Sequence, residues 1–512
     1  MMLAKRFAAL IATLIGRRHR LWPALLVVGL AIVPLATRPL SVDAAVLQVC
    51  PSGCLFTTIQ GALAAASNGD EIDIAAGTYS GGFTITQNVN LVGAGAAATI
   101  INGGAPVVTI AQGVLASIAD LTVTGGNYSF SGGGIANLGG SLTVLRSIIR
   151  NNHADQEGGG IQSVPGGHLY LESSAIVDNT AGGGGGGIAS FGALLSIDAS
   201  LITGNTAVTD GGGVVAEVAT SNGAVTGAAI FSNTTVSGNQ AVRDGGGVIT
   251  NGPLSLIAST ITGNTANASG GGLYNALTTG VVSIEDSIFT ANHADQLGGG
   301  ILNGGQIAMR NSAMRDNTAS GPGGGMYNLG SVAVLDSNIV GNQAGTNGGG
   351  IASPGTLDLE GSVVTGNKAG RNGGGLTTSG AVTQMTISDS RITSNTAQGA
   401  GGAVFNFAGT VAVRNTLIVG NGSPIGGAIA NAGTLTLTDV TVRGNSGVDG
   451  AGLFMFGGQA TATNGQVTEN NASDSGGGIY LLRGTVQLTN AAVRRNTPNN
   501  CFPLNSVPGC AG

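Results

Sequence analysis

The sequence predicts an all-β protein: a single parallel β-helix, or solenoid, of roughly 16 coils that begins with a short capping helix. Three observations lead to this fold. Glycine supplies 93 of the 512 residues while only 9% are charged. A unit of about 25 residues recurs 14 times between residues 132 and 498. Apolar and asparagine positions agree in every copy. A strict repeat of this kind distinguishes a solenoid from a glycine-rich disordered chain.

The repeat unit reads G-G-G-I-x-N-x-G-x-L-x-L-x-x-S-x-I-x-x-N-x-A. Its L-x-L element alternates with period two, which predicts a strand with both leucines on one face. No part of the unit sustains helical spacing over ten residues, so no crossover helix fits between the strands. We therefore expect a three-strand coil that stacks on its copies at roughly 4.8 Å per coil.

One asparagine position is invariant among the 14 copies. In a stack of coils its side-chain amide donates to one neighbour and accepts from the other, so the position predicts a buried ladder at a corner. The predicted ladder comprises Asn152, Asn179, Asn205, Asn239, Asn264, Asn292, Asn317, Asn342, Asn367, Asn395, Asn421, Asn445, Asn470 and Asn496.

The glycine triplet predicts a second corner, because glycine reaches backbone angles that other residues adopt only with strain. The residue after it is apolar in all copies, from Ile135 to Ile479. Most copies are 24 to 28 residues apart, but Val214 and Val248 are separated by 34, which places an insertion near residues 216–228.

The two ends of the rod need covers, because open strand edges pair with other chains. Residues 45–131 are expected to hold the N-terminal cap and the first coils, residues 132–498 the repeat, and residues 499–512 a C-terminal cap. In the N-terminal cap, Thr57 or Thr58 is expected to start a helix that Asn68-Gly69 ends. The expected apolar face of this helix is Ile59, Leu63 and Ala66.

Residues 1–44 have the order of a secretory signal: a basic start, the apolar stretch 21–36, and small residues before Ala45. Cleavage after Ala44 is one interpretation, and an uncleaved membrane anchor is the other. The apolar stretch has 16 residues and two prolines, which is short for a bilayer span of about 20. No later stretch is apolar enough to cross a membrane, so we expect an exported, extracellular or cell-surface protein.

Removal of residues 1–44 leaves 13 basic and 24 acidic side chains, a formal charge of −11. Such a chain is not expected to bind nucleic acid or an anionic membrane. Four cysteines remain, two at each end. In an exported protein, Cys50 with Cys54 and Cys501 with Cys510 predict two local disulfides. The alternative, a metal site, lacks a nearby histidine, and no cofactor is predicted.

Two stretches resemble known β-helix proteins. The segment TTIQGALAAASNGDEIDIAAGTY, followed by VNLVGAG, resembles the opening of the pectin-lyase-like superfamily. The paired GGGI and I-x-x-N motifs resemble the repeats of polymorphic outer-membrane proteins, over about residues 55–498. The resemblance implies a right-handed helix, as is general for parallel crossovers. Members of the superfamily include lyases, glycoside hydrolases and adhesins, so the fold does not decide the function.

A polysaccharide-cleaving site requires converging carboxylates, or a base with a cation. The position before the glycine triplet offers Asp210 and Asp244 in consecutive coils, with Arg243 beside them and Glu157 two coils away. Two interpretations remain: an acid pair with a basic helper, or solvated turn residues, which we favour because other copies carry neutral residues there.

Other polar residues predict structure rather than chemistry. Asp and Asn in a tight bend satisfy backbone donors. The position six residues before the ladder asparagine, taken over all copies of the repeat, forms a column that is expected to lie in a bend. It contains Asp286, Asn311, Asp336, Asp389 and Asp439. The two NHADQ motifs place His153 and His293 five coils apart, roughly 24 Å, which is too far for one site.

Strand alternation predicts that the second residue after the triplet points outward. In the C-terminal half this column contains Tyr274, Tyr327, Phe405, Phe454 and Tyr480. An exposed aromatic stripe on a flat sheet binds a sugar chain or a partner protein. The alternative is that loops cover the stripe.

These observations predict a non-enzymatic scaffold or adhesin-like protein that binds polysaccharide or a surface protein. The alternative function is a polysaccharide lyase or glycoside hydrolase that uses Asp210, Asp244 and Arg243.

Overall fold

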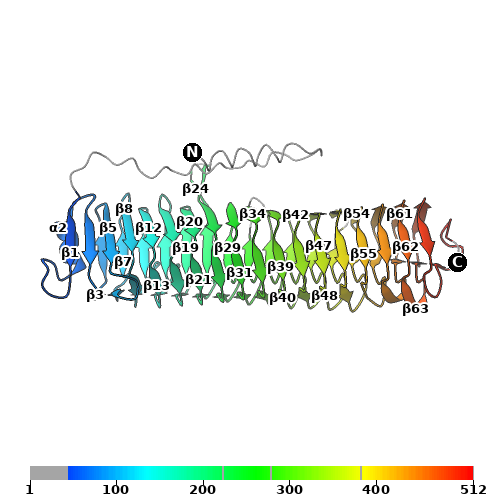
Figure 1. Ribbon diagram of the computed structural model, residues 1–512, viewed down its shortest axis with the longest axis horizontal. Helices are drawn as coiled ribbons and strands as arrows, with labels where there is room; N and C mark the ends of the chain where they lie inside the picture. Colours follow the sequence, from blue (N-terminus) through cyan, green and yellow to red (C-terminus); the bar gives the residue numbers. More distant parts are fainter. Residues whose placement is uncertain (1–43, 222–223, 277–279, 381–382, 511–512) are drawn as a thin grey trace. The chain divides into compact units, whose positions relative to one another are not determined.

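A computed structural model describes residues 44–221, 224–276, 280–380 and 383–510. The predicted signal segment lies outside the described residues, except for Ala44. Residues 45–512 form one compact unit. Within it the predicted all-β parallel β-helix is confirmed, with about 17 coils stacked along one axis (Figure 1).

Most coils contain four short strands rather than the three that we predicted. In one coil these are β45 (Ile351–Ser353), β46 (Thr356–Glu360), β47 (Val363–Thr365) and β48 (Lys368–Ala369). The fourth strand has only two residues and directly follows the ladder asparagine Asn367. Two residues are too few for periodicity to reveal a strand in the sequence.

Equivalent strands of successive coils pair in parallel and form four long sheets. Ile351, for example, pairs with Met326 in the coil before and with Leu376 in the coil after. Sheet 1 has 17 strands, sheet 2 has 18, sheet 3 has 17 and sheet 4 has 11. Sheet 1 runs from β4 (Phe83–Ile85) to β67 (Cys501–Phe502), and sheet 2 runs from β1 (Val46–Val49) to β65 (Thr485–Thr489). Sheet 3 runs from β3 (Gly77–Ser80) to β66 (Ala492–Arg494), and sheet 4 runs from β10 (Asn127–Tyr128) to β52 (Thr396–Ala397).

The interior is a single apolar core that runs the length of the rod. Alternate strand residues face inward, so Leu357 and Leu359 of β46 are both 0% exposed. The buried cluster extends without interruption from Val49 in the first coil to Val507 in the C-terminal loop. Burial at this density is the main source of stability in such a fold.

The backbone turns through a left-handed residue at three corners of the coil. Between sheets 2 and 3 this residue is Asp336, with φ 49°. Between sheets 3 and 4 it is Gly341, with φ 66°, and before sheet 1 it is Gly348, with φ 66°. The first corner confirms the predicted Asp and Asn bend, because asparagine and aspartate tolerate this region best after glycine.

The glycine triplet has two separate causes. Gly348 adopts the left-handed angle, whereas Gly349 and Gly350 lie against the next coil. A Cβ atom on Gly349 would lie 2.4 Å from the carbonyl oxygen of Gly374, and one on Gly350 would lie 2.6 Å from that of Gly375. Neighbouring coils therefore approach too closely for side chains at these positions.

The asparagine ladder is confirmed, and Asn317, Asn342 and Asn367 lie in neighbouring coils. The Nδ2 and main-chain nitrogen of Asn342 both donate to Oδ1 of Asn367, each at 2.9 Å. Oδ1 of Asn342 accepts the same pair of bonds from Asn317, and its Nδ2 also donates to the Met314 carbonyl. Every polar atom of this buried amide is satisfied.

Two more ladders run parallel to the first and were not predicted. At the ends of three consecutive sheet 1 strands, Asn303 Nδ2 donates to Asn328 Oδ1 at 2.7 Å, and Asn328 Nδ2 donates to the hydroxyl of Ser353 at 3.0 Å. Before sheet 3, the main-chain nitrogen of Ser312 donates to the Ser337 hydroxyl at 3.0 Å. Coils in the middle of the rod thus have three buried polar stacks beside the apolar core.

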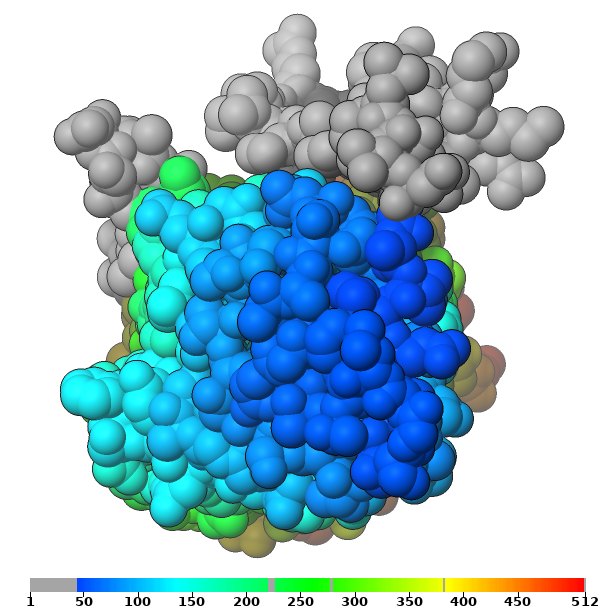
Figure 2. Space-filling model, turned by 90° about the vertical axis from the view of Figure 1, so that its left-hand side faces the viewer, coloured from blue at the N-terminus to red at the C-terminus, as the bar shows by residue number. Residues whose placement is uncertain are grey.

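The N-terminal end is covered by helix α2 (Ile59–Ala65). Thr58 caps it by accepting the main-chain nitrogen of Gly61 at 3.1 Å. Ile59, Ala62 and Leu63 form the buried face of the helix. The helix ends earlier than predicted, because Ala66 is already extended. Figure 2 shows the N-terminal residues filling this end of the β-helix.

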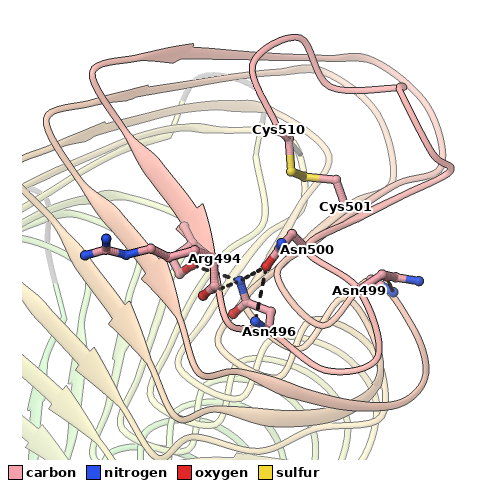
Figure 3. The surroundings of a disulfide bond; sticks show 8 residues. Arg494, Asn496, Asn499, Asn500, Cys501 and Cys510 are labelled. Atoms are coloured by element: carbon pink, nitrogen blue, oxygen red, sulfur yellow. Dashed lines mark hydrogen bonds between the residues drawn. A yellow bond between two sulfur atoms is a disulfide. The ribbon is translucent and has the colours of Figure 1, made fainter. Parts of the chain in front are cut away.

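The C-terminal end is covered by the Cys501–Cys510 loop, and both predicted disulfides are present. Cys501 and Val507 are buried at 1% and 2% exposure, so the loop closes over the last coil. The asparagine ladder ends here as well. Asn496 donates from its main-chain nitrogen and from Nδ2 to Oδ1 of Asn500, each at 3.1 Å (Figure 3).

Removing one ladder amide from the middle of the rod should be costly. Asn342→Ala leaves the main-chain nitrogen of Asn317 without its acceptor, and it removes one of two acceptors from Asn317 Nδ2 and a donor from the Met314 carbonyl. Each buried group left unsatisfied costs about 1–3 kcal/mol. We expect a loss of about 3 kcal/mol in a denaturant unfolding experiment. The matched control is Asn338→Ala, an exposed position of the same coil, which should change stability by less than about 0.5 kcal/mol. Equal effects of the two substitutions would contradict the ladder's role.

Alanine substitutions at two glycine corners distinguish the stability cost of the left-handed backbone angle from the cost of steric crowding. Gly444→Ala and Gly373→Ala introduce a Cβ at φ 62° and 64°. The first meets nothing within 4 Å, whereas the second meets the Leu376 carbonyl oxygen at 2.5 Å. Gly444→Ala should cost about 1 kcal/mol for the left-handed angle alone. Gly373→Ala should cost a further 1–3 kcal/mol or so by overpacking. Thermal unfolding of both variants measures the difference, which would vanish if crowding were irrelevant.

Candidate functional site

The column before the glycine triplet, here called the turn column, lies on the surface of the coil next to sheet 1. The structure brings Asp210 and Asp244 into adjacent coils, as predicted. Arg243 Nη2 lies 2.8 Å from Asp210 Oδ2 and forms an ion pair with it. The Arg243 side chain is 62% exposed, so this pair contributes little to stability.

The carboxylates of the turn column bind main-chain nitrogens of the following coil. Asp210 Oδ1 accepts the nitrogen of Asp244 at 3.1 Å, and Asp244 Oδ1 accepts the nitrogen of Ser269 at 2.9 Å. Glu157 Oε2 accepts the nitrogen of Gly184 at 3.0 Å. Each acid therefore satisfies a backbone donor that the corner geometry leaves unpaired.

Neutral residues of the turn column make the same bonds. Asn347 Oδ1 accepts the nitrogen of Asn372 at 3.2 Å, and Asn372 Oδ1 accepts that of Ala400 at 2.9 Å. An amide thus replaces a carboxylate without loss of the interaction. This equivalence favours a structural role for Asp210 and Asp244 over an acid–base role.

Glu217 joins these acids and was missed in the sequence. It ends β23 (Val214–Glu217), three residues after the apolar residue of its coil, and so belongs to a different column. Its half-buried side chain lies close enough to Glu157 and Asp210 for their charges to act on it. Within the described residues, its carboxylate accepts no hydrogen bond. Only the start of the insertion at residue 216 indicated that this position is unusual.

Burial makes three of these acids harder to ionise. It is the main cause that raises the pKa of Glu157, Glu217 and Asp244 above their ordinary values. The charge of Asp210 raises all three further. Main-chain donors oppose the shift at Glu157 and Asp244. Glu217 has no such compensation and repels Glu157 as well.

The insertion forms a hairpin, β24 (Ala219–Ser221) with β25 (Ala224–Thr226), which projects from the rod (Figure 1). At its base, Glu217, Gly227 and Pro253 line a cavity of about 10 Å³. That volume holds one water position, whereas sites for small molecules have about 300–1,000 Å³. The cavity is too small to hold a sugar ring between two carboxylates.

The aromatic stripe is less exposed than predicted. Phe454 is buried at 5% exposure, and Tyr274, Tyr327, Phe405 and Tyr480 are half-buried. The cause is the first glycine of each triplet, which folds back onto this column. A Cβ on Gly450 would lie 2.8 Å from Cβ of Phe454, and one on Gly270 would lie 2.9 Å from Cβ of Tyr274.

A more exposed aromatic surface exists near the C-terminus. Phe407 and Phe456 lie two residues after Phe405 and Phe454, in the bend that directly follows the sheet 1 strand, and Phe407 is 59% exposed. The ring centroids of Phe454 and Tyr480 are 4.7 Å apart, and those of Tyr480 and Phe502 are 5.1 Å apart. We call these six residues the aromatic cluster: Phe405, Phe407, Phe454, Phe456, Tyr480 and Phe502. Tyr274 and Tyr327 lie outside it.

The two histidine motifs make identical local contacts on sheet 4. His153 Nδ1 lies 2.8 Å from the Thr180 hydroxyl, and its Nε2 lies 3.0 Å from Asp155 Oδ1. His293 repeats both distances with Thr318 and Asp295. They lie on β14 (His153–Ala154) and β36 (His293–Ala294), five strands apart in the sheet, so they do not share a site.

No family model matches the chain, and no curated protein matches it. Among solved structures, the chain is similar to the catalytic unit of a thermostable GH87 alpha-1,3-glucanase from Streptomyces thermodiastaticus strain HF3-3. The identity is 14%, and the match covers 89% of this chain and 69% of the glucanase chain. The TM-score is 0.22, which carries no argument about this protein. Among the described residues no helix is both long and apolar enough to cross a membrane.

Glu217→Gln should stabilise the protein at neutral pH. Because the folded-state pKa of Glu217 lies above its ordinary value of 4.5, the unfolded chain loses this proton first, and stability falls as pH rises between the two values. The substitution removes that penalty. We expect a higher melting temperature at pH 7 and no gain at pH 3.5, where both states are protonated. A gain that is the same at both pH values would show that charge is not the cause.

Proposed function

We propose that the protein is an exported β-helix scaffold that binds a polysaccharide or a protein partner along its surface. The aromatic cluster is the proposed contact. It contains Phe407 as an exposed ring beside half-buried rings whose positions are fixed by mutual packing, an arrangement that limits the entropy lost on binding. Aromatic side chains are common in contacts of this kind because each buries a large, rigid apolar area.

One observation carries the proposal. The carboxylates that a cleaving enzyme would need are hydrogen-bonded to main-chain nitrogens of adjacent coils. Asparagines perform the same task elsewhere in the turn column. Asp210 and Asp244 are therefore accounted for by the architecture of the rod.

Export is supported by the two disulfides, which form and persist in oxidising compartments. The signal-like order of residues 1–44 agrees with this compartment. The likeness of the repeat to polymorphic outer-membrane proteins adds a cell-surface, adhesin-like role to the proposal.

The second candidate function is a polysaccharide lyase or glycoside hydrolase. The observation in its favour is the raised pKa of Asp244, Glu157 and Glu217, because a general acid must hold its proton near neutral pH. Arg243 would supply the positive charge.

Binding is tested on a glycan array with the full chain. Phe407→Ala should weaken binding of any captured glycan about tenfold, the effect of losing one aromatic contact of about 1–1.5 kcal/mol. The matched control is Leu138→Ala, which removes an exposed residue of the same column near the other end of the rod. Binding that is unchanged in Phe407→Ala would overturn the proposed contact.

Cleavage is tested by product release from pectin-like polymers and other glycans. We expect none from the wild-type chain. Release that is lost in Asp244→Asn, with an unchanged melting temperature, would establish the enzyme instead. The melting temperature matters because Asn347 and Asn372 show that an amide retains the backbone hydrogen bond.

A further inference from the structure

The N-terminal end of the rod is acidic. Residues 44–119 form the first coils and contain three carboxylates and no lysine or arginine, a formal side-chain charge of −3. Asp70 is buried and accepts two nearby main-chain nitrogens, so it serves the structure of this end. Glu71 and Asp73 are half-buried on β2 (Glu71–Ile74), and neither forms an ion pair with any residue that the structure describes.

The C-terminal end of the rod is basic. After Asp474 the chain contains three arginines and no acidic side chain, a formal side-chain charge of +3. Arg483 lies in the turn before β65, Arg494 is the last residue of β66 and Arg495 follows it, so all three belong to the last coil. Their side chains are exposed and form no ion pair within the described part of the chain. The two ends of one rod therefore carry opposite charge.

Both ends also expose leucines that the caps do not bury. Leu55 lies between β1 and α2 and is 86% exposed, and Leu504 lies in the C-terminal loop and is 66% exposed. Leu488 of the last coil is half-buried, whereas its equivalent two coils earlier, Leu437, is buried. Apolar surface is therefore available for a contact at each end of the rod.

Sheet 2 has an open edge at both ends. β65 pairs with β61 (Gln459–Thr463), and no described strand pairs with its other side. It contains neither a charged residue nor a proline, with which proteins usually protect an exposed edge. β1 pairs with β2, and on its outer side only Val49 has a bridge partner, Phe56. Main-chain groups of the same sheet are thus unpaired at opposite ends of the molecule.

We propose that the protein assembles head to tail with copies of itself, the C-terminal end of one rod docking on the N-terminal end of the next. In this arrangement the arginines of the last coil oppose Glu71 and Asp73, and the exposed leucines of the two ends cover each other. Opposite charges steer the two ends together and fix their orientation. Each added copy leaves a free end, so the contact does not close and the product is a linear filament.

The charges disfavour other contacts between two copies. Two C-terminal ends would bring two sets of arginines together, and two N-terminal ends would bring two sets of carboxylates together. Side-by-side contact would join two bodies that each have a formal charge of −11 after removal of residues 1–44. Juxtaposed like charges are unfavourable, so the head-to-tail contact is the one that the charge distribution supports.

Sedimentation velocity on the full chain, expressed with residues 1–44 so that the host processes them, measures the assembly. We expect species that grow with protein concentration and that shrink as the salt rises from about 50 to about 500 mM, because salt screens exposed charges. Electron microscopy should show unbranched rods in multiples of roughly 80 Å, the length of about 17 coils. Dimers that do not grow further, or lateral arrays, would overturn the proposal.

Reversing the charge of the last coil tests the contact directly. Arg494→Glu combined with Arg495→Glu should weaken self-association at least about tenfold, because the acidic ends then repel. Glutamate fits the left-handed corner at 495, since the equivalent residue of the preceding coil is Glu469 with φ 56°. The matched control is Arg310→Glu combined with Arg315→Glu, two exposed arginines of one coil in the middle of the rod, which should change association by less than about twofold. Equal losses in the two double variants would contradict an end-to-end contact.

A charge swap distinguishes a lost contact from a misfolded variant. Glu71→Arg combined with Asp73→Arg makes both ends basic, and this variant alone should not assemble. Mixed with the Arg494→Glu, Arg495→Glu variant, each of its ends meets an acidic end, so filaments in which the two variants alternate should return. A mixture that does not assemble would overturn the proposal. Phe407→Ala should leave assembly unchanged, so this contact and the aromatic cluster of the proposed function succeed or fail separately.

Discussion

Every feature of this protein depends on one constraint: each coil must satisfy the main-chain hydrogen bonds of the next. Strand pairing meets this need on four sheets, as in the register of Met326, Ile351 and Leu376. At the corners, where strands end, side chains meet it instead. Asn342 accepts the main-chain nitrogen of Asn317, and Ser337 accepts that of Ser312. A coil that departed from the repeat would leave donors unpaired on the coil before it and would remove a donor from the acceptor on the coil after it, and buried unpaired polar groups are expensive.

The same constraint determines which polar residues are available for function. Side chains at inward-facing and corner positions pack against, or hydrogen-bond to, the adjacent coils. The acids of the turn column are among them. Asp244 resembles a catalytic residue in the sequence because it is an acid in a row of acids, yet its partner is the nitrogen of Ser269. Outward-facing positions have no such duty. Lys368 and Phe407 differ from their equivalents in neighbouring coils without disturbing the hydrogen bonds of the rod, so binding specificity can vary there at little cost in stability.

The sequence predicts those parts of the structure that repeat. The asparagine ladder, the apolar columns and the left-handed bend at Asp336 recur in all 14 copies of the repeat, so a single sequence is enough to show them. Features that occur in only one or a few coils cannot be predicted in this way, because no repetition in the sequence reveals them. The short fourth strand at Lys368–Ala369 is below the length that periodicity detects. Glu217 approaches Glu157 only because the coils bring two different columns together. The period-two pattern puts the residues from Tyr274 to Tyr480 on sheet 1 strands, but their burial depends on how the glycine turn folds over them.

The direction of the ladder explains why the two ends of the rod differ. Between ladder asparagines, donation always runs toward the C-terminus: the main-chain nitrogen and Nδ2 of one donate to Oδ1 of the next, while Nδ2 also donates to a main-chain carbonyl of the preceding coil. At the first member the acceptor is used by a main-chain nitrogen, that of Gly126, which any residue provides. At the last member two donors of Asn496 need an oxygen in a place where no further coil follows. Asn500 provides it from only four residues away, and the Cys501–Cys510 disulfide begins at the next residue. The loop therefore holds in place the acceptor that ends the ladder, besides covering the apolar core. At the end where the ladder donates, a specific side chain must supply the acceptor oxygen. At the end where the ladder accepts, the main-chain nitrogen of any residue other than proline is enough.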